Sequence, residues 1–205
     1  MQGTVFTIGH STHSQEKFLE LLAMHRITAI CDVRSMPFSR VNPQFNRKEL
    51  KNVLNANGIE YVFLGKELGA RSDDDDCYVN GKVQYDRLAH TNLFKQGIQR
   101  IQKGMEGYRL ALMCAEKEPL ECHRSILVSR HLTKSGIEVR HIHATGKIES
   151  HEDALNRLVH MLKLSQGDMF KDAFAVAYRK QEERIAYEKT EEAPAPTVPA
   201  AGAFG

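Results

Sequence analysis

The side chains best suited to chemistry in this chain are collected in the segment LALMCAEKEPLECHRS. Cys114 and Glu116 follow a short apolar run, and Cys122, His123 and Arg124 come directly before a helical pattern. Two thiols, a carboxylate, an imidazole and a guanidinium therefore fall within one predicted strand-to-helix connection. Such connections lie at the rim of an α/β sheet, where binding sites are common. The segment predicts a functional site at this rim.

Two of these residues are candidate nucleophiles. A thiol beside a helix N-terminus and cationic side chains has a lowered pKa and is more often the reactive thiolate. Cys122 stands next to His123 and Arg124, so it is the better candidate, while Cys114 ends the preceding strand. Glu116 is a third catalytic candidate. The alternative is that both cysteines are small core residues, as free cysteines often are.

The same segment allows a metal or a redox interpretation. Cys114, Cys122 and His123 could be three ligands of a metal ion, with His10 or His13 as the fourth. The spacing is not a standard zinc pattern, and there is no second CxxC pair, so we predict no metal and no other cofactor. A reversible disulfide between Cys114 and Cys122 is a further possibility.

Polar residues follow strand after strand along the chain. They are His10 and Ser11 after the first predicted strand, Asp32 and Arg34 after the second, and Cys114 and Glu116 after the fourth. In a parallel sheet these strand ends lie at one edge, so the residues should meet there. His10 and Asp32 therefore join the catalytic candidates.

The positive charges of this edge suggest that it binds an anion. The predicted binding residues are Arg34, His123, Arg124, Ser125 and Ser11. The forked guanidinium donors of Arg34 and Arg124 suit phosphate or carboxylate, and the helix that opens near Arg124 adds free backbone N–H groups. The alternative is that Arg34 pairs with Asp32 or Glu116 and only holds loops together.

Short β-rich runs alternate with helical patterns. The predicted strands cover residues 4–8, 28–33, 59–64, 109–113 and 137–142. Helices are predicted from the caps Ser14, Asn46 (a capping box with Glu49) and Ser150, along Phe94, Ile98, Ile101 and Met105 to Gly107, and over residues 125–134. Residues 65–85 are predicted to be a long loop. The alternation predicts a mostly parallel sheet with helices on both faces, in three layers.

The bulk properties place these elements in one domain with an appendage. We expect an α/β domain over residues 1–165, a charged helix over 166–190 and a flexible Pro/Ala/Gly tail over 191–205. The 205 residues carry a net charge of +2, which is not the composition of a polyanion-binding protein. Neither a membrane span nor a signal peptide is indicated. We therefore expect a cytoplasmic protein with reduced cysteines and no membrane partner.

Several segments together resemble a known family. They are TIGHS near the start, DVRSMPFSR after the second strand, the Phe-Asn pair at 45–46, the Leu-Gly pair at 68–69 and CAEKEPLECHRS. Over about residues 4–145 the chain resembles the bacterial and archaeal family called domain of unknown function 488. The resemblance implies a single α/β domain, with recurring family positions at Asp32, Arg34, Cys114, Glu116, Cys122, His123 and Arg124. Ala70 stands where many relatives have a second glycine.

Three functions are compatible with these observations. The first is a cysteine-dependent enzyme that acts on an anionic, phosphate- or nucleotide-like small molecule. The second is a module that binds nucleic acid or a small anion without turnover, using Arg34, Arg40, Arg47, Lys48, Phe38 and Phe45. The third is a redox or metal sensor that uses the cysteine pair. The oligomeric state is left open.

Overall fold

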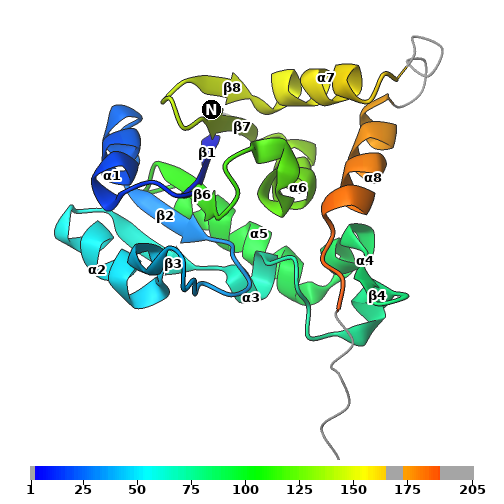
Figure 1. Ribbon diagram of the computed structural model, residues 1–205, viewed down its shortest axis with the longest axis horizontal. Coiled ribbons are helices and arrows are strands. Elements are labelled where there is room, and N and C mark those ends of the chain that lie inside the picture. The colour runs from blue at the N-terminus through cyan, green and yellow to red at the C-terminus, as the bar shows by residue number, and fades with distance from the viewer. Residues whose placement is uncertain (1–2, 165–172, 190–205) are drawn as a thin grey trace, which may run out of the picture.

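A six-stranded sheet forms the centre of the protein. The computed structural model describes residues 3–164 and 173–189 (Figure 1). The sheet has the strand order β3-β2-β6-β1-β7-β8, with strands β1 (Thr4–Gly9), β2 (Ala29–Asp32), β3 (Glu60–Phe63), β6 (Leu110–Cys114), β7 (Glu138–Ile142) and β8 (Ile148–Ser150). All neighbours pair in parallel except β7 and β8. The predicted α/β class with a mostly parallel sheet is confirmed; the short edge strand β8 was not predicted.

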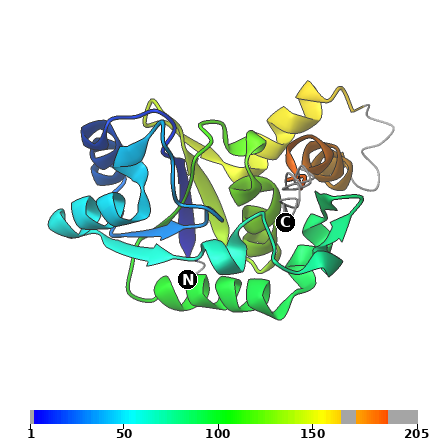
Figure 2. The ribbon, with the colours of Figure 1, turned by 60° about the horizontal axis from the view of Figure 1, so that its bottom comes forward.

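Helices cover both faces of this sheet. They are α1 (Gln15–Met24), α2 (Arg47–Ala56), α3 (Gly65–Leu68), α4 (Tyr85–His90), α5 (Asn92–Gly104), α6 (Arg130–Lys134), α7 (His151–Met161) and α8 (Ala173–Ile185). The core divides into two hydrophobic clusters because successive strand residues point to opposite faces. Phe6 and Ile8 pack with α1 and α2, whereas Val5 packs in the other cluster with α5 and α6. Figure 2 shows α1 and α2 together on one side of the sheet.

Local sequence signals explain most helix starts. Ser14 accepts a hydrogen bond from the Lys17 N–H, and Ser150 accepts one from the Asp153 N–H, as capping residues do. The predicted capping box at Asn46 is wrong. Asn46 precedes α2, but its side-chain oxygen accepts from the Ser39 N–H at 2.7 Å instead. It therefore holds the loop after β2 rather than the helix end.

The predicted long loop over residues 65–85 is also wrong. It contains α3, a 3-10 turn at Asp75–Cys77, and a hairpin of β4 (Tyr78–Val79) and β5 (Lys82–Val83). The helix predicted to follow it is divided into α4 and α5 at Thr91, whose side chain caps α5, and α5 ends at Gly104 instead of Gly107. Elements of two to four residues have too few positions for a periodic pattern, so sequence periodicity does not reveal them.

The end of the described chain packs against the main body. In α8, Gln181 Nε2 donates to the Leu120 carbonyl at 2.8 Å, and Glu182 Oε1 accepts from the Tyr85 N–H at 2.7 Å. After α8, the carbonyl of Tyr187 accepts from the Val83 N–H. The predicted tail at 191–205 and residues 166–172 of the predicted charged helix lie outside the described residues. None of the described helices has the length and apolar character needed to cross a membrane.

Candidate functional site

The ends of the central strands form one row, as the parallel arrangement requires. Gly9 is paired with Cys114, and Asp32 is paired with Met113 and with Phe63. A Cβ atom at Gly9 would lie 1.9 Å from the Glu116 carbonyl oxygen, so only glycine lets the loop after β6 cross β1 here. The strand ends therefore bring the predicted residues to one edge of the sheet.

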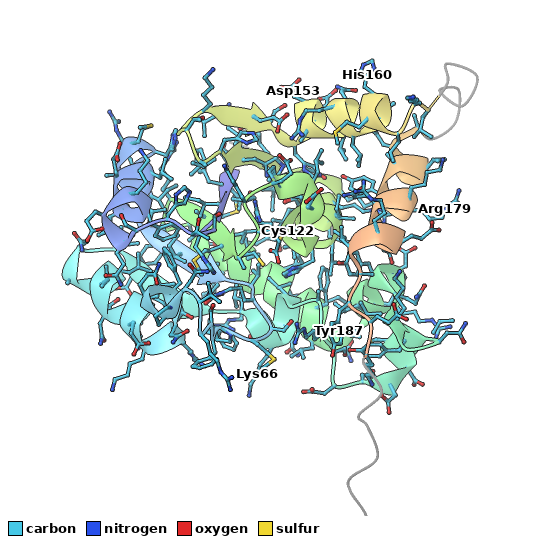
Figure 3. The ribbon with its side chains drawn as sticks, viewed as in Figure 1. Lys66, Cys122, Asp153, His160, Arg179 and Tyr187 are labelled. Atoms are coloured by element: carbon cyan, nitrogen blue, oxygen red, sulfur yellow. The ribbon has the colours of Figure 1, made fainter. Side chains whose placement is uncertain are left out.

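A cavity of about 280 Å³ opens at this edge. It is lined by Arg34, Ser35, Met36, Ala70, Arg71, Tyr85, Cys114, Ala115, Glu116, Glu121, Cys122, His123, Ile185 and Tyr187. In Figure 3, Cys122 is labelled near the middle of the molecule and Tyr187 on the segment that follows α8. The cavity thus combines side chains from the sheet edge with side chains from the C-terminal segment.

Polar groups surround the Cys122 sulfur. Its Sγ lies 2.9 Å from Glu116 Oε2 and 3.9 Å from His123 Nδ1, and it accepts from the Arg124 N–H at 3.4 Å. Arg124 opens a π-helical turn (Arg124–Ser129) that continues into α6, and such turns are frequent at functional sites. Cys114 Sγ lies 3.7 Å from the same His123 nitrogen. Both thiols are free.

The two thiols differ in their tendency to ionise. Burial opposes ionisation of Cys122, but a hydrogen bond from Cys114 and the charges of Arg124 and His123 outweigh it and hold its pKa well below the ordinary value. Burial and the neighbouring Cys122 raise the pKa of Cys114, which therefore keeps its proton. Burial and the Cys122 charge also raise the pKa of Glu116. The site thus favours a thiolate at Cys122 beside the protonated thiol of Cys114.

His123 is held in one orientation. Its Nε2–H donates to the Val33 carbonyl at 3.0 Å, so Nδ1 faces the two sulfur atoms. Burial lowers the pKa of His123, but its hydrogen bond with Cys122 and the charges of Cys122 and Glu116 raise it overall. The Cys122 thiolate therefore favours the protonated imidazole, and the ring is also a fixed wall of the cavity.

Arg34 forms a buried network with Asp32. Its Nε and Nη2 donate to the two carboxylate oxygens at 2.9 and 2.7 Å, and Nη2 also donates to the Phe45 carbonyl. The Tyr61 hydroxyl donates to the same carboxylate, and Arg34 Nη1 lies 3.1 Å from His10 Nε2. Asp32 and His10 stand behind Arg34 and are not part of the cavity wall. Of the two alternatives for Arg34, the pairing with Asp32 is the one observed.

Three predicted binding residues also lie behind the cavity wall. The Arg124 guanidinium donates to the carbonyls of Glu116 and Lys117 at 2.7 and 3.4 Å, so it holds the loop between the cysteines. Ser125 is buried, and its hydroxyl has no partner among the described residues. The Ser11 N–H donates to the Ala115 carbonyl. Both guanidinium groups thus have partners within the protein, while Arg34 still lines the cavity, so the anion clamp by Arg34 and Arg124 stays a prediction.

The cluster offers ligands for a soft metal ion as well. The sulfur atoms of Cys114 and Cys122 and the Nδ1 atom of His123 lie within 4.8 Å of one another. The hydrogen bond from His123 to the Val33 carbonyl resembles the way in which proteins orient a ligating imidazole. Neither His10 nor His13 belongs to this group of described residues. A metal ion would use the same atoms as a thiolate nucleophile and would compete with it.

We expect acidification to destabilise the protein partly through His10. Burial and the Arg34 charge lower its pKa from 6.5 to about 4 in the folded protein. Between these values the unfolded chain binds more protons than the folded one, so stability falls as the pH drops from 6.5 towards 4. The loss from His10 should be at most about 3 kcal/mol. Urea unfolding at pH 7.5, 6 and 5 measures it. The free energy of unfolding of His10→Gln should fall less than that of the wild-type protein over this pH range. An identical fall in both proteins would contradict the contribution of His10.

Several cavity residues, among them Arg71, Tyr85 and Tyr187, were not predicted from the sequence. Arg71 and Tyr85 come from the segment predicted to be a loop, and Tyr187 comes from the charged C-terminal segment. Tyr85 begins α4, and its backbone is fixed by Glu182 of α8. In the sequence, the only indication that Tyr85 belongs to the site is its aromatic side chain next to a segment rich in Gly and Asp, and this indication is weak. Contacts between segments that lie about a hundred residues apart leave no trace in a single sequence.

A comparison with protein families matches residues 14–131 to the family described as domain of unknown function DUF488. This range includes both cysteines, His123 and Arg124, but it ends before α7, α8 and the C-terminal cavity wall. A comparison with curated proteins gives no match, and a comparison with solved structures gives none either. The matched range covers more than half of the 205 residues and contains the cysteine segment. The chain therefore belongs to the DUF488 family.

Proposed function

We propose that the protein is a cysteine-dependent enzyme that acts on an anionic, phosphate- or nucleotide-like substrate, with Cys122 as its nucleophile. One observation carries the proposal. The Cys122 sulfur lines an open cavity while the Arg124 N–H, the His123 ring and the Glu116 carboxyl group surround it. A cysteine that serves only to fill the core does not need three polar partners.

The neighbouring groups suit the two halves of a displacement reaction. The thiolate of Cys122 forms a bond to the electrophilic atom of the substrate while the bond to the leaving group breaks. The leaving group takes the proton of the nearby Glu116 carboxyl group. Water then attacks the same atom, gives its proton back to Glu116 and releases the sulfur as thiolate. His123 and the Arg124 N–H stabilise the thiolate at the beginning and at the end.

Cys114 has a supporting role in this scheme. Its pKa is raised by burial, so its S–H persists at neutral pH and can donate a hydrogen bond to the Cys122 sulfur. The strand position of Cys114 fixes this donor at the cavity floor. The asymmetry between the two thiols is the reason for assigning the nucleophile to Cys122 and not to Cys114.

The nucleic-acid alternative receives less support from the same geometry. Two of its six residues, Arg34 and Phe45, are buried. Arg47 is stacked on the Phe63 ring with its guanidinium carbon 4.2 Å from the ring centroid. Phe38 remains 65% exposed. Fewer of the six residues are therefore available to contact a nucleic-acid backbone. For this reason we prefer a small-molecule substrate to a nucleic acid.

Turnover of p-nitrophenyl phosphate, a chromogenic phosphate ester, tests the proposal. We expect slow hydrolysis at pH 7 by the wild-type protein and a loss of at least about a hundredfold in kcat/KM for Cys122→Ser. Cys77→Ser is the matched control, because Cys77 is a buried free cysteine that does not line this cavity, and it should retain turnover. Equal turnover by the two variants would contradict the proposal.

Two further measurements separate the competing uses of the site. One equivalent of tightly bound zinc or iron in the purified protein, together with an unreactive Cys122, would favour a metal site. Quantitative formation of a Cys114–Cys122 disulfide under mild oxidation, without turnover of any phosphate ester, would favour redox sensing.

A further inference from the structure

A second and larger hollow lies next to the cavity that contains Cys122. Its volume is about 650 Å³. The two hollows share four lining residues, which are Ser35, Met36, Arg71 and Tyr187. We call the first the inner hollow and the second the outer hollow. A ligand of ordinary cofactor size could therefore occupy both, since binding sites of a few hundred cubic ångströms are typical.

Arg71 stands at the boundary between the two hollows. Its backbone N–H donates to Ser35 Oγ at 3.0 Å, and its guanidinium carbon lies 4.4 Å from the centroid of the Tyr187 ring. Arg71 forms no salt bridge with any carboxylate in the described parts of the chain. The Arg34 guanidinium, by contrast, already donates hydrogen bonds to the Asp32 carboxylate and to the Phe45 carbonyl. Arg71 Nη1 donates only to the weak acceptor Met36 Sδ, at 3.2 Å, so Arg71 is the guanidinium of the inner hollow that lacks a carboxylate partner among these residues and can meet an anion.

The outer hollow combines aromatic rings with positive charge. Phe63, Tyr78 and Tyr187 line it together with three cations, Lys66, Arg71 and Lys189, and a single carboxylate, Asp73. All three rings already have a cation over one face: Arg47 covers Phe63, Arg71 covers Tyr187, and Lys189 Nζ lies 4.0 Å from the Tyr78 centroid. Lys189 also pairs with Asp75, so Lys66 and Arg71 are the lining cations that have no carboxylate partner among the described residues. Aromatic rings and cations together are how proteins hold a planar base that carries a phosphate.

The C-terminal segment supplies one wall of this arrangement. Tyr187 is held against the β4–β5 hairpin by the hydrogen bond from the Val83 N–H to its carbonyl, and the Lys189 N–H donates to the Gly81 carbonyl. Figure 3 shows Tyr187 on this segment and Lys66 near it, although the two come from distant parts of the sequence. The wall lies beyond residues 14–131, so it is an addition to the part of the chain that matches the family.

We propose that the outer hollow binds the base of a nucleotide and that Arg71 binds its phosphate. The group of the substrate that Cys122 attacks then lies in the inner hollow. This inference rests on the proposed function and narrows its substrate to a nucleoside phosphate. Three observations carry it: the shared wall of the two hollows, the Arg71 guanidinium that has no carboxylate partner among the described residues, and the aromatic and basic lining beyond it.

Calorimetric titration of the full chain with AMP, ribose 5-phosphate and adenosine tests the proposal. AMP should bind at least tenfold more tightly than ribose 5-phosphate or adenosine, because only AMP has both a base for the outer hollow and a phosphate for Arg71. Bound AMP should also slow alkylation of Cys122 by iodoacetamide at least tenfold. Ribose 5-phosphate or adenosine binding as tightly as AMP would overturn the proposal, as would a lack of AMP binding.

Variants at the shared wall test the location. Arg71→Ala and Tyr187→Ala should each weaken AMP binding about tenfold, whereas Tyr187→Phe keeps the ring and should keep the affinity. Arg109→Ala is the matched control, since Arg109 is exposed and stacked on Phe6 but lines neither hollow. Melting temperatures confirm that each variant is folded. Unchanged affinity in both alanine variants would place AMP elsewhere.

The two proposals fail in different ways. If Cys122 is reactive and p-nitrophenyl phosphate is turned over while AMP binds no better than its parts, the nucleotide inference is wrong and the cysteine-dependent enzyme stands. If Cys122 is inert, the proposed function itself is wrong.

Discussion

Iodoacetamide is expected to label Cys122 at pH 7 at least about a hundred times faster than Cys31. A hydrogen bond from the Cys114 thiol and the charges of Arg124 and His123 hold the pKa of Cys122 well below its ordinary value, and Cys122, although only 1% exposed, lines the cavity at the sheet edge. Cys31 lies in a central strand, where burial raises its pKa to about 12. At pH 7 only about one Cys31 side chain in 10⁵ is then a thiolate. Mass spectrometry of timed alkylation measures both rates.

The pH profile separates ionisation from access. A thiol of ordinary pKa loses about a factor of ten in rate for each pH unit below that pKa. Cys122 should instead lose less rate than this between pH 8 and pH 6, because its pKa is held well below the ordinary value. Cys114→Ala removes the hydrogen-bond donor, so the labelling rate of Cys122 should depend steeply on pH in this variant. Cys114→Ser keeps a donor, so the rate should depend less steeply on pH than in Cys114→Ala. Equal and slow labelling of all cysteines in the folded protein would mean inert core thiols.

The meeting of the strand ends could be predicted because it follows from topology. Parallel strands present their carboxyl ends at one edge, so residues after β1, β2 and β6 had to come together. The register confirms this, with Gly9 opposite Cys114 and Asp32 opposite Met113. The neighbourhood of Cys114, Glu116, Cys122 and His123 is therefore available from the sequence pattern alone.

The direction in which each side chain points could not be predicted in the same way. Arg124 follows Cys122 by two positions and was expected to bind an anion, yet its guanidinium turns to the carbonyls of Glu116 and Lys117. Arg124 is only 1% exposed where the loop between the cysteines covers it, and a buried guanidinium needs acceptors, which these two carbonyls supply. This need depends on the loop conformation, which no spacing rule supplies.

The C-terminal wall of the cavity was beyond sequence reasoning for a different reason. Tyr187 and Ile185 reach the site because Gln181 and Glu182 bind Leu120 and Tyr85 and because the Tyr187 carbonyl accepts from the Val83 N–H. These are single contacts between distant segments, with no periodic pattern and no motif. The helix itself was predictable from its composition, but its docking position was not.

Asp32→Ala is expected to destabilise the protein by about 3–5 kcal/mol, the range found when one partner of a buried ion pair is removed. The Asp32 carboxylate is fully buried and accepts from the Arg34 side chain and from the Tyr61 hydroxyl. Without it, a guanidinium that is only 6% exposed would lose its counter-ion, and a buried hydroxyl would lose its acceptor. Urea unfolding monitored by circular dichroism at pH 7 measures the difference in free energy.

Glu138→Ala is the matched control for this variant. Glu138 pairs with Arg140 near the sheet surface, where the two side chains are 42% and 46% exposed. An exposed pair of this kind contributes only about 0–1 kcal/mol, because water screens the charges and both side chains lose freedom. If the two alanine variants lose similar stability, the buried Asp32–Arg34 pair does not stabilise the fold more than an exposed pair does. A large difference between them would instead show that Arg34 serves mainly to anchor the loop after β2, which leaves Arg71 to meet the substrate anion.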